Sequence, residues 1–496
     1  MLFNSIHFLI FFPVVLLIYF FIPKNTRYIW LLLASYYFYM GWNPQYALLL
    51  LFSTAITYVS SLLLYRMKES PGKKKLVLTF CAIANFAILF VFKYFTFIFS
   101  SVKAILELVH ITIPDITINL LLPVGISFYI FQAVGYMIDV YREEIVPERN
   151  FFKYALFVSF FPQLVAGPIE RSKRFMPQIQ NLHSIDLWNS NRICSGACIM
   201  LYGYMLKMII ADRAAIFVNT VYQAETYNNY VGFTVLVAAV LFSVQIYCDF
   251  AGYSFIAIGA AKIMGIELMN NFDAPYFATS IKDFWSRWHI SLTTWFRDYL
   301  YIPLGGSKKG YVRKYINILI VFIVSGLWHG ASWHYVIWGL LHGVLRIIEE
   351  ITKKGREKVA NLMKVRRNVF SYKLFCGCIT FFIVTIAWIF FRAGDTRQAL
   401  DIIHNLFSQM NTWVLFDGSL FTFGLDAKDF NILIVFCCIM LVVDYLRNKK
   451  VSISMHFVKQ NIIFQWLVFI IGLWCIFVFG VYGPDFDATQ FIYFQF

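Results

Sequence analysis

Long apolar runs recur along the whole of this 496-residue sequence, and short polar segments separate them. A run of about 20 apolar residues crosses the hydrocarbon core of a bilayer as a helix. Because 60% of the residues are hydrophobic and 14% are charged, the composition excludes an ordinary water-soluble protein. The sequence therefore predicts an all-α polytopic membrane protein with about 10–12 transmembrane helices.

Basic residues give the chain a formal charge of +15 at pH 7, but they stand in short clusters between the apolar runs. This distribution is typical of the positive-inside rule of membrane insertion, and it argues against nucleic acid as a partner. The clusters are therefore expected on the cytoplasmic side; they are residues 66–75, 142–149, 308–314, 353–367 and 447–450.

The apolar runs alternate across the membrane without contradiction if the N-terminus lies outside, and the C-terminus is then also outside. The first run, near 6–22, has no basic leader and no small-residue cleavage site, so we expect it to be retained as a helix. The expected spans are 5–23, 27–41, 46–65, 76–99, 121–140, 193–222, 231–262, 372–392, 431–447 and 463–483. We predict one membrane domain over 1–496, with N-terminal helices in 1–122, a core with the polar motifs in 123–392, and C-terminal helices with an aromatic tail in 393–496.

Two segments do not fit as simple crossings. Residues 312–349 begin and end beside basic clusters, so the chain is expected to enter the membrane and return, turning near Gly330. From Tyr315 to His329 a helix climbs about 21 Å at about 1.5 Å per residue, well into a core roughly 30 Å thick. Residues 151–170 are expected to re-enter in the same way, broken at Phe161-Pro162-Gln163. Irregular backbone at that depth is tolerated where it lines a cavity, so the two segments predict a central cavity.

The turn itself carries Gly326-Leu327-Trp328-His329-Gly330-Ala331-Ser332-Trp333. An ionisable side chain at membrane depth is costly, and it marks a functional site by default. The alternative is a structural histidine that is hydrogen-bonded between helices. We favour the functional interpretation for His329.

Residues 283–300 have too many polar side chains for lipid and too many tryptophans for water, so we expect an interfacial or pore-lining helix there. On such a helix His289 and Arg297 lie close to one face, and we favour a donor-facing role for His289, Arg287 and Arg297. The tryptophans alone are equally consistent with an aromatic belt at the interface. The turn that follows is expected to offer open backbone amides and two lysines, Lys308 and Lys309, where a phosphate group of a donor could bind.

Four motifs, in their order along the chain, resemble those of the membrane-bound O-acyltransferase family, and within it the bacterial branch that acetylates alginate and peptidoglycan. They are Pro123–Phe128, Phe161–Ile169, Asp283–Gly306 and Ser325–Trp333. The resemblance implies helices that ring a thin central plate with a tunnel through it. It also implies that His329 is the catalytic histidine and His289 the second polar histidine. The tunnel lining is expected to include Trp288, Trp328, Trp333, Arg287, Arg297 and Asp249.

The chemistry of such a site is simple. Acyl transfer from a thioester to a hydroxyl needs a base near neutral pKa, and histidine is the side chain whose ordinary pKa lies there. The sequence has no Gly-x-Ser-x-Gly motif, so a serine triad is not expected. The predicted donor is acetyl-CoA, with an acetylated carrier as the alternative, and no bound cofactor is expected.

The last six residues, Phe491–Phe496, are strongly aromatic. One interpretation is an interfacial anchor. The other rests on resemblance to the C-terminal motif of the small single-span partner of the family's teichoic-acid D-alanylating member. That resemblance implies that Tyr493 is an outside-facing acyl acceptor, a relay between His329 and a further acceptor.

Several other polar residues attract attention. His334 and His342 lack metal-ligand spacing, so we expect packing or tunnel lining and no metal site. The nine cysteines show no CxxC pair and are expected to act as small hydrophobic residues. Asp249 is expected to face a cavity or a cationic partner such as Arg287. Glu170 and Arg171 fit either a family motif position or a cytoplasmic ion pair.

The expected setting is the bacterial cytoplasmic (inner) membrane, with an extracytoplasmic cell-surface glycan as the final acceptor. No glycan-binding soluble domain is evident in the sequence, so an extracytoplasmic or membrane-anchored SGNH-type acetyltransferase partner is expected to complete the transfer. Within the enzyme interpretation the alternative is D-alanyl transfer to teichoic acids. Outside it, the alternatives are a polysaccharide-related transporter or scaffold. A transporter predicts inverted repeats, and the Trp/His motifs do not recur in the two halves.

Overall fold

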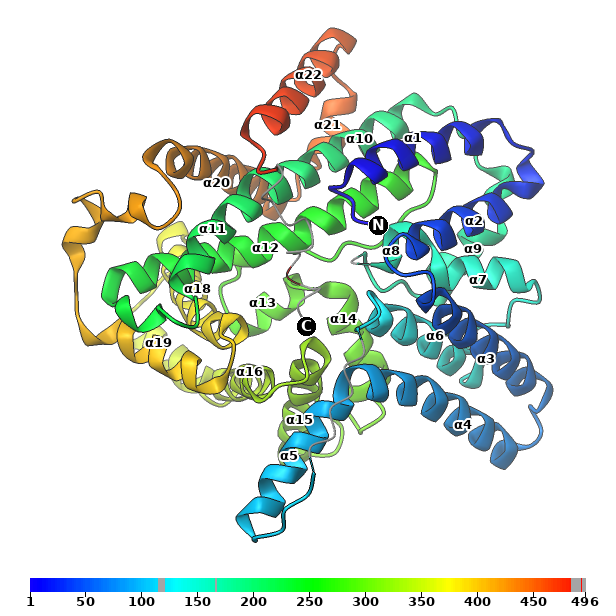
Figure 1. The fold of residues 1–496 in the computed structure, drawn as a ribbon, viewed down its shortest axis with the longest axis horizontal. Coiled ribbons are helices and arrows are strands. Elements are labelled where there is room, and N and C mark those ends of the chain that lie inside the picture. Colours follow the sequence, from blue (N-terminus) through cyan, green and yellow to red (C-terminus); the bar gives the residue numbers. More distant parts are fainter. Residues whose placement is uncertain (115–120, 166, 483–491, 493–496) are drawn as a thin grey trace. The chain divides into compact units, whose positions relative to one another are not determined.

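The computed structural model describes residues 1–114, 121–165, 167–482 and 492. Every regular element among them is helical (Figure 1). Eight of the described helices are long and apolar enough to cross a membrane. They are Tyr46–Arg66, Pro71–Leu108, Ser190–Val221, Gly232–Ile263, Tyr311–His329, Phe370–Arg392, Ala427–Asn448 and Ile462–Phe479. The predicted all-α polytopic membrane fold is therefore confirmed.

The chain divides into two compact units. Unit 1 comprises Met1–Gly196 and Ala257–Met269, and unit 2 comprises Ala197–Ile256 and Asn270–Phe496. Two helices, α10 (Ser190–Tyr204) and α12 (Gly232–Ile263), contribute residues to both units. The polar motifs around His289 and His329 belong to unit 2, so unit 2 contains the candidate site.

Unit 1 consists of helices that pack around a buried α6. Its remaining elements are α1 (Ile6–Phe21), α2 (Arg27–Met40), α3 (Tyr46–Arg66), α4 (Pro71–Leu89), α5 (Phe95–Leu108), α6 (Ile126–Tyr141), α7 (Phe151–Ser159), α8 (Phe161–Leu164) and α9 (Ser172–Gln180). The predicted break in 151–170 is confirmed, because α7 ends at Ser159 and Pro162 lies in the first turn of the separate α8. Gly125 has a φ of 73° and approaches the carbonyl of Leu164 so closely that a Cβ would clash, so the two motifs of unit 1 are in contact.

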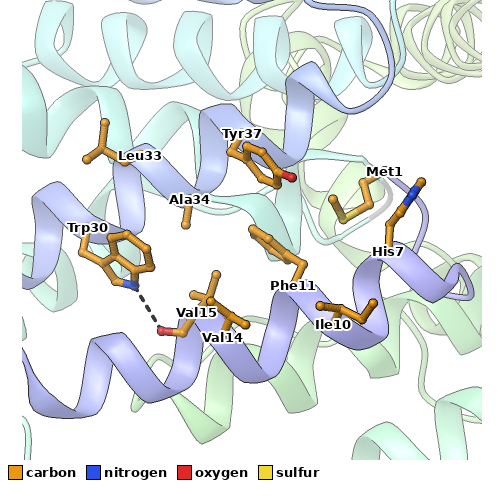
Figure 2. Close-up of a pocket in the computed structure, with 10 residues that line it drawn as sticks. All are labelled: Met1, His7, Ile10, Phe11, Val14, Val15, Trp30, Leu33, Ala34 and Tyr37. Atoms are coloured by element: carbon orange, nitrogen blue, oxygen red, sulfur yellow. Dashed lines mark hydrogen bonds between the residues drawn. The ribbon is translucent and has the colours of Figure 1, made fainter.

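A cavity of about 430 Å³ lies between α1 and α2 (Figure 2). Its lining is mostly apolar, and the Trp30 indole N–H closes one side by donating to the Val15 carbonyl at 3.1 Å. Ile10 and Leu33 in this lining are 62% and 60% exposed. Exposed apolar side chains on helices of a membrane protein are suited to lipid contact, and we assign no chemistry to this cavity.

Glu170 in unit 1 is buried, with 2% of its surface exposed. Its Oε1 accepts the Met269 backbone N–H and lies 3.4 Å from Arg174 Nη1. Burial raises the pKa of this carboxyl to about 7, while the Arg174 charge acts in the opposite direction. Arg174 therefore forms an ion pair with Glu170, and the charge of the neighbouring Arg171 also lowers the pKa of this carboxyl.

This burial predicts a pH dependence of stability. The folded-state pKa of Glu170 lies above its ordinary value of 4.5, so the folded state binds the proton more tightly than the unfolded state. The stabilisation that this proton gives the folded state is lost as the pH rises to about 7. Glu170→Gln keeps an acceptor for the Met269 N–H and does not titrate. We expect the melting temperature of this variant to fall less than that of the parent between about pH 5 and pH 8. The matched control is Glu69→Gln, an exposed position; equal slopes for the parent and both variants would contradict the prediction.

Unit 2 is organised around a helical hairpin of α15 (Tyr311–His329) and α16 (Trp333–Ile351). The two helices pack closely because Gly326 abuts the Tyr335 carbonyl and Gly339 abuts the Phe322 carbonyl, with no room for a Cβ. The predicted turn near Gly330 is confirmed. The other helices of unit 2 are α11 (Asp212–Val221), α13 (Ile281–Arg287), α14 (Ile290–Phe296), α17 (Lys353–Leu362), α18 (Phe370–Arg392), α19 (Thr396–Ser408), α20 (Ala427–Asn448), α21 (Ile453–Val458) and α22 (Ile462–Phe479) (Figure 1).

Candidate active site

His329 is the last residue of α15, and 3% of its surface is exposed. Its ring lies among aromatic side chains, with centroid distances of 5.0 Å to Trp328, 5.1 Å to Trp338 and 5.2 Å to Phe391. These rings come from α15, α16 and α18. The imidazole is therefore held in an apolar wall built by three helices.

His289 lies beside the same wall. Its ring is 5.7 Å from that of Trp328 and 4.7 Å from that of Phe250, and 1% of its surface is exposed. The Trp328 indole therefore touches both histidines, which are far apart in the sequence. The structure therefore brings together His289 and His329, the two histidines predicted for the site, with Trp328 in contact with both.

The predicted continuous helix over 283–300 is wrong. α13 ends at Arg287 and α14 begins at Ile290, and His289 between them has a φ of 42°, in the left-handed region. The loop before α13 explains the break, because Asp273 N–H donates to the Arg287 carbonyl and Ile290 N–H donates to the Asn271 carbonyl. Such backbone conformations are costly for residues with a Cβ, and they concentrate at functional sites.

The break also changes the expected relation of His289 to Arg297. His289 is buried, whereas the Arg297 side chain is 61% exposed and pairs with Asp298 at 2.8 Å. His289 precedes the first residue of α14, and Arg297 follows its last residue. The prediction that both residues lie on one face of a single helix is therefore wrong.

Behind His329 the aromatic wall continues into a cluster of tryptophans. Trp338 stacks on Trp388 at 5.5 Å, and Trp288 lies 5.0 Å from Trp388. The Trp285 indole N–H donates to His342 Nδ1 at 3.2 Å, so His342 packs in the cluster as expected. All five side chains are buried. Of the predicted lining residues, Trp288 and Trp328 belong to this wall, but Trp333 is 55% exposed.

The sequence analysis missed Trp388 and Phe391 of α18. Their aromatic character is visible in the sequence, but Trp388 stands four residues before the end of α18, where a tryptophan of an interfacial belt also stands. Which face of α18 meets α16, however, is decided by tertiary packing.

A cavity of about 370 Å³ begins at Gly330, the residue after His329. Its lining mixes polar and aromatic side chains, and it consists of Asn219, Phe242, Gln245, Gly330, Ala331, Ser332, His334, Tyr335, Phe391, Arg392, Ala393, Gly394 and Ile492. His334 lines this cavity, and its Nδ1 is 2.9 Å from Ser332 Oγ. Hydroxyl, amide and guanidinium groups over aromatic rings are suited to bind a polar molecule close to His329.

Asp249 has a cationic partner, as predicted, but this partner is Lys207 and not Arg287. Asp249 pairs with Lys207 at 2.6 Å, and Lys207 also lies 2.8 Å from Asp212. Arg287 instead binds Asp283 at 2.7 Å. A lysine within a span is a recognisable signal for a buried partner, but the partner is decided by the way in which the helices cross.

Lys308 and Lys309 are exposed in the turn before α15. The amides of Gly305, Gly306 and Lys308 donate to carbonyls within the turn, at 2.9–3.2 Å. At these three positions the predicted open amides are therefore absent.

Two further expectations concern the tail and metals. Tyr493 lies outside the described residues, whereas its neighbour Ile492 is described and is 4% exposed. Within the described part of the chain, no group of three or more His, Cys, Asp or Glu residues is placed to hold a metal ion.

Comparison with known proteins agrees with the geometry. A family model described as MBOAT, membrane-bound O-acyltransferase family, matches residues 142–391. The chain is also 36% identical over 412 residues to "Probable alginate O-acetylase AlgI" of Pseudomonas syringae pv. tomato, which covers 82% of this chain and 75% of that protein. The chain belongs to the membrane-bound O-acyltransferase family.

Two other relatives are named for the transfer of different acyl groups. The peptidoglycan O-acetyltransferase of Helicobacter pylori is 34% identical to this acyltransferase over 436 residues, which cover 82% of this chain and 80% of the relative. The teichoic acid D-alanyltransferase of Bacillus subtilis is 31% identical over 248 residues, which cover 48% of this chain and 62% of the relative. This acyltransferase is therefore similar to both acetyl- and alanyl-transferring proteins, with longer matches to the acetyl-transferring ones.

Proposed function

We propose that this acyltransferase moves an acetyl group from a cytoplasmic thioester donor to an extracytoplasmic cell-surface polysaccharide of the alginate or peptidoglycan kind. The long matches to alginate and peptidoglycan acetylating proteins support the acetyl group and the acceptor class. The observation that carries the proposal is the position of His329, which is buried in an aromatic wall and directly precedes Gly330 in the lining of a polar cavity.

Two helices that end at this cavity support the proposed direction of transfer. α15 starts at Tyr311 beside the basic cluster 308–314, and α18 starts at Phe370 beside the basic cluster 353–367. Both helices end at the cavity, at His329 and Arg392. At about 1.5 Å per residue, α15 spans about 27 Å, close to the roughly 30 Å of a bilayer core. Because basic clusters face the cytoplasm, the cavity belongs to the extracytoplasmic side.

In this proposal His329 is the general base. It accepts the proton of the attacking hydroxyl as the oxygen bonds to the thioester carbonyl carbon, the C–S bond breaks, and the proton passes to the leaving thiolate. His289 is the second polar histidine of the proposed site, because its ring contacts the same Trp328 indole as that of His329. Indole N–H groups and backbone amides at the Gly330 turn are the donors for the developing oxyanion.

The first acceptor is proposed to be the phenol of Tyr493, from which a partner takes the acetyl group onward. Ile492 supports this assignment, because it lines the cavity that begins at Gly330. The donor is proposed to be acetyl-CoA, attracted by Lys308, Lys309 and the basic helix α17, with an acetylated carrier as the alternative. The partner is proposed to be an extracytoplasmic SGNH-type acetyltransferase, and the setting is the bacterial inner membrane with both termini outside.

A second candidate is D-alanyl transfer, which the match to the Bacillus subtilis teichoic acid D-alanyltransferase favours. That match covers 48% of this chain, against 82% for the acetyl-transferring relatives. The acetyl group is therefore preferred, and D-alanine remains the competing acyl group to test.

The test is peptide mass spectrometry of the purified full chain after incubation with acetyl-CoA, comparing the parent with Tyr493→Phe and His329→Ala. We expect an acetyl group on the peptide that contains Tyr493 in the parent, and no acetyl group there in either variant. Tyr482→Phe, at an exposed tyrosine of the same chain, is the matched control and is expected to label like the parent. An unlabelled parent, from a sample shown to be folded, would contradict the relay; labelling with a D-alanyl donor alone would favour the second candidate.

A further inference from the structure

A buried ionic cluster lies in unit 2, outside the aromatic wall. Lys207 Nζ is 2.8 Å from Asp212 Oδ1 and 2.6 Å from Asp249 Oδ1, and all three side chains are at most 5% exposed. Two carboxylates facing one ammonium leave an excess of negative charge. Excess buried charge is unfavourable unless further hydrogen bonds reach it, so this cluster is expected to attract donors from another segment.

The local backbone is built to form this cluster. Lys207 lies in a π-helical stretch, Met205–Ala211, and such stretches are frequent at functional sites. Just before it, Gly203 and the Gly252 carbonyl approach too closely for a Cβ, and Gly252 abuts Lys207 as well. Only glycine permits two helices to come this close, and this approach brings Lys207 within reach of Asp249 on α12.

The second oxygen of Asp249 binds the chain near its C-terminal end. Asp249 Oδ2 accepts the backbone N–H of Ile492 at 2.8 Å, and Ile492 is 4% exposed. A backbone N–H donated to a buried carboxylate is a charge-assisted hydrogen bond, which is stronger than a neutral one. The same residue lines the cavity that begins at Gly330.

We propose that the Lys207–Asp249 ion pair is the docking anchor that holds Ile492 in the lining of the cavity that begins at Gly330. Asp249 is then a positioning residue, since it acts through the backbone of Ile492 and does not touch the reacting atoms. The docking requires no acetyl transfer. Only its consequence for catalysis, the presentation of Tyr493, rests on the proposed function.

The anchor can be tested by the reactivity of a cysteine at position 492. Ile492→Cys keeps the backbone N–H, and a buried thiol reacts slowly with a maleimide, read by peptide mass spectrometry on the purified full chain. We expect Asp249→Ala in this background to raise the alkylation rate of the new cysteine at least about tenfold, because the hydrogen bond is lost. Asp249→Asn, which retains an acceptor oxygen, is expected to restore much of the protection.

The matched control is Asp212→Asn, which removes the other carboxylate of the cluster and leaves the Ile492 contact in place. In each single variant Lys207 keeps the other carboxylate as a partner, so both variants are expected to fold. Equal alkylation rates in the parent and in Asp249→Ala would overturn the proposal. A rate in the parent as high as that of the exposed Cys438 would also overturn it.

A second arm avoids the buried charges. Ile492→Pro removes the N–H donor and leaves the ion pair intact. With Gln245→Cys as a reporter in the cavity wall, this variant is expected to react several-fold faster than its parent, and an unchanged rate would overturn the anchor. Acetyl labelling of the same variants separates the anchor from the relay. Faster alkylation together with normal acetylation of the final acceptor would support the anchor and contradict the relay.

Discussion

His329→Ala is expected to lower acetyl transfer by about 10²–10⁴-fold, the usual contribution of a general base. The imidazole is the proposed proton acceptor, and the rings packed against it, Trp328, Trp338 and Phe391, have no group that could accept the proton in its place. The measurement is the rate of acetyl transfer from radiolabelled acetyl-CoA in proteoliposomes, at equal amounts of monodisperse protein.

The control for this variant is His404→Ala, an exposed histidine of α19 in the same unit. It is expected to retain the activity of the parent. His329→Gln, which keeps hydrogen-bonding capacity but cannot act as a base, is expected to be as inactive as the alanine variant. Substantial transfer by the glutamine variant would assign His329 a structural role and leave the base unidentified.

Gly330→Ala is expected to reduce acetyl transfer by about 10²-fold with a smaller effect on folding. A Cβ at this position would meet the ring of Tyr335, which is itself held against Phe391 at 5.2 Å. The turn must therefore shift, and a displacement of about 1 Å at a reacting group can cost 10²-fold in rate. Steady-state acetyl transfer and thermal unfolding of the same sample separate the two effects.

The matched control is Gly355→Ala in α17, where a Cβ would meet nothing within 4 Å. This variant is expected to transfer acetyl groups at the parental rate. If Gly330→Ala were equally active, the backbone of the turn would not be part of the geometry that aligns His329, and the oxyanion role proposed for its amides would also fail.

The class of fold and the two histidines followed from the sequence alone. Apolar run length determines which segments cross a bilayer, and the cost of an ionisable group at that depth singled out His329. The hairpin that carries it was also predictable, since basic clusters flank residues 312–349 on both sides. These are properties of single segments, and they need no knowledge of neighbours.

The tertiary structure decided the rest. Three features depend on how distant helices cross: the pairing of Asp249 with Lys207, the break of 283–300 into two helices, and the stacking of Trp388 on Trp338. The left-handed backbone of His289 illustrates the reason, because local propensity disfavours it and hydrogen bonds from the 271–273 loop hold Arg287 and Ile290 on either side of it. The sequence determined which segments are apolar enough to cross a membrane, and packing determined which side chains are buried and which groups they meet, because long-range contacts are not encoded in any local pattern.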